Sequence, residues 1–338
     1  MKTKKKILIV NVNWLGDVLF STPLIRAIRH KNPDAHIACM VIPRCYQILE
    51  GNPHLDELII YDEEGAHKGV LGKLKFASVL RRIKFDEAII LHRSLTRAFL
   101  VALAKVPKRV GYYTKKRGFL LTDKPMAPEG QIHRMDLFCE LGQKLGVEVK
   151  DRYPEFYITD PDRQYVEKIL KEAGIEPKRK MAVLNPGGNW NPKRWPKEQF
   201  AKLANALVDK YGFDVVISGS GKDIPLGEEI KKLSGVKVFI ACGRTNLKQL
   251  GALMEAANIV ISNDSGPLHI AAAMGATTVA LFGPTSPKIT GPRAKSNVYI
   301  LQKEVGCRIP CYSLMCRNNR CMKAITVEDV CKCIEKYS

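Results

Sequence analysis

A carboxylate at Asp17 and a lysine at Lys193 are the two charged side chains whose surroundings most favour chemistry. Asp17 follows Gly16, just after the apolar run Lys6–Asn11, which predicts a buried strand. A carboxylate at the carboxyl end of such a strand can face a ligand and act as a general base. The alternative is an acidic residue in the first turn of a helix, where it stabilises the helix dipole.

Lys193 lies in one of two similar loops in the second half of the chain. The adjacent Gly187 and Gly188 end the predicted strand Met181–Asn185 and allow a ligand to approach the backbone closely. A lysine beside such a loop can neutralise a phosphate, although a solvated basic turn is the alternative. The loop Gly219–Asp223 follows the next strand in the same way, which makes Asp223 a further candidate.

The stretch Asn258–Thr285 contains a third loop of this kind. It predicts a strand at Asn258–Ser262, a tight loop, and a helix that begins near Ser265. Ser265 is a suitable N-cap, and the free N–H groups at a helix start bind phosphate or carboxylate. His269, one turn into the helix, can face the same ligand. An ordinary capped helix after a strand is the alternative.

The chain of 338 residues has a formal net charge of +20, which favours an acidic partner such as nucleic acid, an anionic membrane or a phosphorylated substrate. Residues 93–124 form a basic belt that includes Arg93, Arg97 and Arg117, and His133 lies close to it in the sequence. The belt can bind an anionic acceptor or form a solvated face. Few aromatic residues interrupt it, which argues against single-stranded nucleic acid, and no helix-turn-helix or RNP signature indicates another mode of nucleic-acid binding.

The start of the chain has too short an apolar run for a signal peptide, and no segment reaches 18 apolar residues. We therefore expect a cytoplasmic protein without a transmembrane segment. Four scattered cysteines are expected to be buried core residues: Cys39, Cys45, Cys139 and Cys242. Six further cysteines follow from Cys307 to Cys333, where reduced thiols or a disulfide are favoured over a metal.

Predicted strands and helices alternate along the chain, which is typical of doubly wound α/β domains with parallel sheets. The polar, proline-containing residues 146–180 separate two such series. We predict an N-terminal domain over 1–160, a second domain over 161–325, and a last helix, Thr326–Tyr337, within residues 326–338.

Five motifs resemble glycosyltransferase family 9, the ADP-heptose:lipopolysaccharide heptosyltransferases, and follow one another in the family's order over nearly the whole chain. The Trp14-x-Gly16-Asp17 form is most similar to the heptosyltransferase II group. The motifs are NWLGDVLFSTPLIRAIR from Asn13, RVGY from Arg109, NPGG…KRWP from Asn185, GSGKD from Gly219 and SNDSGPLHIAAAMGATTVALFGPT from Ser262.

The resemblance implies a GT-B fold, with an N-terminal acceptor domain and a C-terminal nucleotide-sugar domain facing across a cleft. It also implies that the last helix, within residues 326–338, returns to the first domain. It implies inverting transfer of heptose from ADP-heptose, without metal or cofactor, to the phosphorylated inner core attached to lipid A at the membrane surface. Asp17 matches the catalytic base. The residues that match the donor site or lie in its loops are Gly187, Gly188, Lys193, Asp223, Asp264, Ser265, Gly266 and His269.

Acceptor contacts are expected from Gly16, Arg93, Arg97, Arg117 and His133. Two alternatives remain at this stage: a family-9 transferase with another nucleotide sugar or glycan acceptor, and a non-catalytic basic binding module. The enzyme would be cytoplasmic and can associate peripherally with the inner face of the inner membrane.

Overall fold

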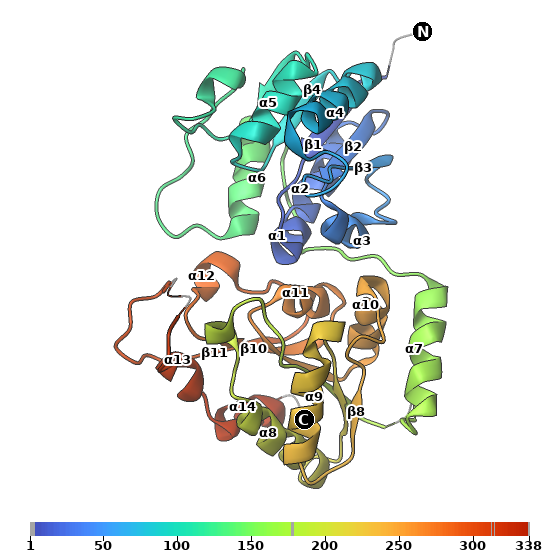
Figure 1. Cartoon of the computed structure of the whole chain (residues 1–338), viewed down its shortest axis with the longest axis vertical. Helices are drawn as coiled ribbons and strands as arrows, with labels where there is room; N and C mark the ends of the chain where they lie inside the picture. Colours follow the sequence, from blue (N-terminus) through green and yellow to red (C-terminus); the bar gives the residue numbers. More distant parts are fainter. Residues whose placement is uncertain (1–3, 177–178, 312, 314, 337–338) are drawn as a thin grey trace. The chain divides into compact units, whose positions relative to one another are not determined.

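The computed structural model describes residues 4–176, 179–311, 313 and 315–336. The chain divides into two compact units, Met1–Tyr157 and Ile158–Ser338 (Figure 1). Each unit is a parallel β-sheet with helices packed on it, so the prediction of two doubly wound α/β domains is confirmed.

The first unit contains a five-stranded sheet in which every neighbouring pair is parallel, in the order β3-β2-β1-β4-β5. Its central strand β1 has the continuous apolar sequence Ile7–Val10, which is buried because helices cover both faces of the sheet. The strands are β1 (Lys6–Val10), β2 (His36–Val41), β3 (Glu57–Ile60), β4 (Glu87–Ile90) and β5 (Lys108–Val110).

Helices α4 and α5 pack side by side, and their apolar faces contact one face of this sheet (Figure 1). Helices α1, α2, α3 and α6 contact one another. The helices of the first unit are α1 (Leu15–Phe20), α2 (Thr22–Lys31), α3 (Tyr46–Leu49), α4 (Gly69–Ile83), α5 (Leu95–Leu103) and α6 (Arg134–Lys144), with short 3-10 turns η1 (Pro43–Cys45) and η2 (Gly118–Leu120).

The spacing of apolar residues such as Leu19, Leu24 and Ile28 predicts a single helix over Val18–His30. This prediction is wrong, because the chain forms two helices that are separated at Ser21. The Ser21 hydroxyl donates to the carbonyl of Val18 at 2.7 Å and accepts from the Asn11 amide at 2.8 Å. Pro23 then stands in the first turn of α2, where its missing N–H is tolerated. The break makes α1 a separate short helix that starts before Gly16.

The second unit contains a six-stranded parallel sheet in the order β11-β10-β9-β6-β7-β8. The chain order therefore reverses between β6 and β9, and ligands of open α/β sheets bind at such a switch point. The strands are β6 (Met181–Asn185), β7 (Asp214–Ile217), β8 (Val238–Ile240), β9 (Ile259–Asn263), β10 (Thr277–Phe282) and β11 (Val298–Gln302).

The helices of this unit surround its sheet (Figure 1). They are α7 (Asp160–Glu172), α8 (Lys197–Asp209), α9 (Ile224–Leu233), α10 (Leu247–Ala256), α11 (Gly266–Ala273), α12 (Pro287–Thr290), α13 (Arg320–Lys323) and α14 (Val327–Glu335), with 3-10 turns η3 (Asn191–Lys193) and η4 (Gly221–Asp223).

Helix α14 packs against α8 and β11 of the second unit. Its apolar residues Val330, Cys333 and Ile334 belong to that unit's core. This packing differs from the expectation that the last helix returns to the first domain, because its apolar side is already covered by the second unit. The predicted helix also included Tyr337, which lies outside the described residues.

Candidate active site

Asn263 at the end of β9 connects three segments beside the switch point of the second sheet. Its side-chain amide donates to the carbonyls of Pro186 and Gly187, at 2.8 and 3.3 Å, in the loop after β6. Its side-chain oxygen accepts from the backbone N–H of Trp195 at 3.0 Å. The side chain is buried. One asparagine therefore fixes the glycine loop and the KRWP turn against the end of β9.

Lys193 lies in an ion pair at the same place. Its ammonium is 2.6 Å from Asp264 Oδ2, and the Thr285 hydroxyl donates to the same oxygen at 2.6 Å. Asp264 is only 5% exposed, whereas Lys193 keeps 22% of its side chain accessible. The geometry makes Asp264 a group that orients the lysine, and the partly exposed ammonium is the group that can meet an anion.

Helix α11 begins directly after this ion pair. Ser265 is the N-cap residue, as predicted, but its side chain makes no capping hydrogen bond. Its hydroxyl lies 3.4 Å from the Asn185 side-chain oxygen instead. The helix start therefore leaves backbone N–H groups near Gly266 uncapped by Ser265, which suits an anion. His269 lies on the same helix and is buried.

The GSGKD loop after β7 is a compact turn closed by Asp223. Its carboxylate accepts from the Ser220 N–H at 2.9 Å and from the Ser220 hydroxyl at 2.7 Å. A Cβ at Gly187 would lie 3.0 Å from Asp223 Oδ1, and one at Gly219 would lie 2.8 Å from Asp223 Cβ. The absence of a side chain at Gly187 thus permits the loop after β6 to pack closely against the loop after β7. Asp223 stabilises the loop after β7 through its hydrogen bonds to Ser220. The backbone carbonyl oxygen of Gly188, the second glycine of the loop after β6, accepts hydrogen bonds from the Arg194 guanidinium.

In the first unit, Asp17 lies in the first turn of α1, after the loop that follows β1, and is partly buried. It is near Cys45: burial raises the pKa of that thiol to about 11, and the Asp17 carboxylate acts in the same direction. Gly16 precedes it on the same helix. Trp14 is 56% exposed, and the Arg44 guanidinium lies 4.7 Å from the centre of its ring.

Arg97 has a different environment from the one expected for an acceptor-binding residue. It is buried, donates to the Asn13 side-chain oxygen at 2.8 Å and pairs with Glu63 at 3.1 Å. Its guanidinium also lies 5.0 Å from the centre of the Tyr61 ring. Burial lowers the pKa of Arg97. This residue therefore holds the loop after β1 in place.

Arg117 is also buried, and its guanidinium donates to the carbonyls of His92 and Tyr112, the latter at 2.8 Å. Burial lowers its pKa to about 10, with a further contribution from Arg93. A Cβ at Gly111 would lie 3.3 Å from Arg117 Nη2, which explains the glycine of the RVGY motif. Of the three predicted arginines, only Arg93 is exposed.

His133 is the N-cap of α6 and is buried. Its Nδ1 accepts from the Met135 N–H at 3.2 Å, and its ring packs edge-on against Phe20 with centroids 4.9 Å apart. The imidazole thus joins α6 to α1, the helix that carries Asp17. It contributes to the position of the candidate base through packing.

The family model for glycosyltransferase family 9 (heptosyltransferase) matches residues 73–321. The chain belongs to glycosyltransferase family 9. It is 32% identical over 298 residues to lipooligosaccharide heptosyltransferase 2 of Haemophilus influenzae, with 85% of each chain covered. Family membership makes it a glycosyltransferase and argues against a non-catalytic binding module.

Two solved structures of family-9 proteins are similar over nearly their full length. A glycosyl transferase family 9 from Veillonella parvula has a TM-score of 0.90 and 26% identity, with 100% of this chain and 98% of that chain covered. ADP-heptose lps heptosyltransferase II of E. coli has a TM-score of 0.80 and 25% identity, with 98% of both chains covered. The predicted GT-B fold class is therefore confirmed.

The motifs in the sequence identify the region of this family-9 site, but they indicate no role for Asn263 or Thr285. Both lie inside the motif that starts at Ser262, and both are buried polar residues that bond to other site residues. Their position in the motif was the available signal. A pattern of residue types gives no indication of which polar group contacts a ligand and which orients its neighbour.

His92, after β4 in the same family-9 chain, is expected to remain neutral at physiological pH. Burial lowers the pKa of His92 to about 4, and the charges of Arg97 and Arg117 add to this. An unfolded histidine binds its proton near pH ~6.5, so the free energy of unfolding should fall as the pH falls from about 6.5 to about 4. NMR titration of the imidazole and urea unfolding across this range measure both effects.

The control for His92 is the His92→Asn variant. Its side-chain oxygen can accept the Ser94 N–H that His92 Nδ1 accepts at 3.0 Å, but it does not titrate. This variant should lose part of the pH dependence of stability between pH ~4 and ~6.5. An imidazole that titrates near its ordinary pKa, or an unchanged pH dependence in the variant, would contradict the prediction.

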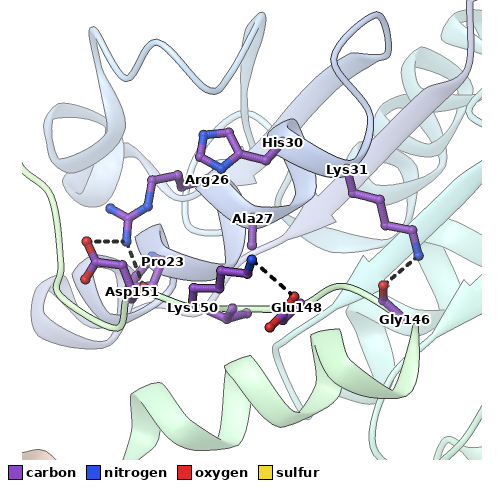
Figure 2. A pocket seen from close by; sticks show the side chains of 10 residues that line it. Pro23, Arg26, Ala27, His30, Lys31, Gly146, Glu148, Lys150 and Asp151 are labelled. Carbon is purple, nitrogen blue, oxygen red and sulfur yellow. Dashed lines mark hydrogen bonds and ion pairs between the residues drawn. The ribbon is translucent and has the colours of Figure 1, made fainter.

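The first unit also contains a cavity of about 520 Å³, lined by α2 and the segment Gly146–Asp151 (Figure 2). The charged groups around it bond to one another or to the backbone. Arg26 lies 3.5 Å from Asp151 Oδ2, and Lys31 donates to the Gly146 carbonyl at 2.9 Å. Because these groups are already paired, we assign no substrate to this cavity.

The four cysteines expected in the core are all buried. In the late group, Cys321 and Cys333 are buried, whereas Cys307 and Cys316 are exposed. Within the described part of the chain, no three His, Cys, Asp or Glu side chains are arranged to hold a metal ion.

Proposed function

We propose that this family-9 glycosyltransferase transfers heptose from ADP-heptose to the phosphorylated inner core of nascent lipopolysaccharide, with inversion at the anomeric carbon. The observation that carries the proposal is the similarity to proteins named heptosyltransferase 2 over 85% of both chains. The Lys193–Asp264 pair and the start of α11, which meet at the switch point of the second sheet, support a diphosphate-binding role.

In this mechanism Asp17 accepts the proton of the attacking acceptor hydroxyl as the new glycosidic oxygen–carbon bond forms. The bond between the anomeric carbon and the diphosphate oxygen breaks on the opposite face, and ADP leaves with the electron pair. Asp17 suits the role because α1 is anchored on both sides, by Ser21 against Asn11 and by Phe20 against His133. Because the carboxylate is already held in place, orienting it for proton transfer costs little additional entropy.

Negative charge develops on the leaving diphosphate, and Lys193 is the cation that the second unit offers to it. Asp264 and Thr285 hold its ammonium in one orientation before the donor binds. The N–H groups at the start of α11 add fixed partial positive charge. Fixed donors of this kind stabilise charge that develops in a transition state better than mobile solvent does.

For the acceptor, Arg93 is the exposed member of the predicted contacts and is proposed to meet a core phosphate. Arg97, Arg117 and His133 act through position, because each is buried and bonded to the backbone or to neighbouring side chains. Gly16 leaves the turn before Asp17 without a side chain that would obstruct the acceptor. The described residues include no helix long and apolar enough to cross a membrane, and we propose peripheral attachment on the cytoplasmic side.

The test is turnover of ADP-heptose against defined inner-core acceptors, with and without the first transferred heptose. We expect transfer from ADP-heptose to an inner-core acceptor, and the comparison of the two acceptors determines whether the first heptose is required. In a thermal unfolding assay, ADP-heptose at 100 times its Kd should add about 2.7 kcal/mol of stability.

UDP-glucose and GDP-mannose serve as donor controls and should give little shift at the same concentration. A larger shift and faster turnover with either control would favour the alternative, a family-9 transferase with another nucleotide sugar. Transfer from ADP-heptose to an unrelated glycan but not to the inner core would reject the proposed acceptor.

A further inference from the structure

Helices α4 and α5 of the first unit expose apolar side chains on the side that faces away from the sheet. On α5, Leu95, Phe99 and Leu103 recur every fourth residue and are all exposed, while Leu100 and Val101 are buried. The exposed apolar residues of α4 are Val70, Leu71, Leu74 and Val79. Leu71 is 83% exposed. Each helix is therefore apolar on its buried side and on part of its outer side.

These exposed residues form one surface, because the elements that carry them are in contact. Helix α5 contacts α4, which lies beside it in Figure 1, and it also contacts η2. Phe119 of η2 is 76% exposed. In contrast, the exposed large apolar residues of the described second unit are fewer: Ile224 and Leu233 lie at opposite ends of α9, Ile300 on β11, and Met315 outside the helices and strands. We call the outer side of α4, α5 and η2 the α4–α5 surface.

The charge of the α4–α5 surface has one sign. Residues 65–85 and 88–122 contain no Asp or Glu. Six of its exposed cations are Lys75, Arg81, Arg82, Lys105, Lys115 and Lys116. None of these six forms an ion pair with another described residue. Apolar side chains surrounded by unpaired cations match an anionic lipid surface, where the chains enter the interface and the cations meet the headgroups.

We propose that the α4–α5 surface binds the anionic phospholipid bilayer. It would place the first unit beside a lipid-linked acceptor, and in this respect the inference extends the proposed function. Binding to lipid itself requires neither donor nor turnover. Apolar insertion and electrostatic attraction act together at such a surface, so removal of either part should weaken attachment.

The experiment is co-sedimentation of the full chain with vesicles of phosphatidylcholine that contain about 30% phosphatidylglycerol, a composition that supplies the negative surface potential. We expect binding to these vesicles, little binding to pure phosphatidylcholine, and weaker binding in about 0.5 M salt. Lys75→Glu/Arg82→Glu should weaken binding by at least about tenfold, because each cation near an anionic surface contributes substantially to attachment. Leu71→Ser should weaken it several-fold.

Matched changes elsewhere serve as controls. Lys231→Glu/Lys232→Glu makes the same change in net charge on exposed residues of α9, and Leu233→Ser removes an exposed leucine from the same helix. These controls should bind vesicles like the unmodified chain. All variants should keep turnover on a lipid-free inner-core acceptor, since none alters a residue of the proposed active site.

Equal loss of binding in the α9 controls, or binding that ignores lipid charge, would overturn the proposal. So would a wild-type dimer that becomes monomeric in Leu71→Ser, because the surface would then join two copies of the chain. Tighter binding to a DNA duplex, lost in Lys75→Glu/Arg82→Glu, would assign the surface to nucleic acid. An unmodified chain that does not bind anionic vesicles but shows normal turnover would reject only this surface, whereas absent turnover with normal vesicle binding would reject only the proposed function.

Discussion

Replacement of Asp17 by Ala is expected to lower kcat by about 10²–10⁴-fold, the usual contribution of a general base. The affinity for ADP-heptose should change little, because Asp17 belongs to the first unit and the proposed diphosphate contacts belong to the second. Single-turnover transfer and donor-induced thermal shifts measure the two quantities separately. The Asp17→Asn variant should behave in the same way, since an amide cannot accept the proton.

The matched control is Asp34→Ala, which removes an exposed carboxylate of the same unit. It should leave turnover within a factor of about two, because surface changes away from special features have small effects. A fall of kcat that is as large in Asp34→Ala, or nearly normal turnover in Asp17→Ala, would reject Asp17 as the base. Parallel thermal unfolding establishes that both variants are folded.

Lys193→Met is expected to produce two separate losses. The rate of transfer should fall by about 10²–10³-fold, the usual effect of one lost transition-state donor. Stability should also fall, by roughly 3 kcal/mol, because Asp264 would keep a buried carboxylate without its cation. Steady-state kinetics with ADP-heptose and urea unfolding measure these losses.

The double variant Lys193→Met/Asp264→Asn distinguishes the two effects. It removes both charges, so most of the stability should return, while the rate should remain low because the diphosphate still lacks the ammonium. Asp264→Asn alone should keep the cation but hold it less firmly, with a smaller loss of rate than Lys193→Met. Recovery of the rate together with the stability in the double variant would show that Lys193 matters only for folding.

The alternation of strands and helices could be predicted because the buried strands of both sheets are continuous apolar runs, such as Ile7–Val10. The break between α1 and α2 was not predicted, because the apolar residues on its two sides, such as Leu19 and Leu24, keep a helical spacing across Ser21. Ser21 ends α1 by bonding to Val18 and to Asn11, and the latter contact joins residues that only the fold brings together. Strand β11 was not predicted because it is half-exposed and lies at the edge of its sheet.

The site was only partly predictable for a related reason. A run of basic residues does not indicate which side chains turn inwards, and Arg97 and Arg117 turn inwards to hold loops. Lys193 and Asp264 were both named as ligands of the donor, but their mutual contact gives them different roles. Charge and motif identify the region, whereas burial and distance decide the role of each residue.

The hydrogen bonds of Asn263 have a thermodynamic consequence for donor recognition. Because one buried side chain already joins the glycine loop to the KRWP turn, the donor does not have to order these segments when it binds. The conformational entropy that mobile loops would lose has been given up during folding instead. Discrimination among sugar nucleotides then rests on the fit to a rigid surface, and the stability of the second unit and its selectivity depend on the same asparagine.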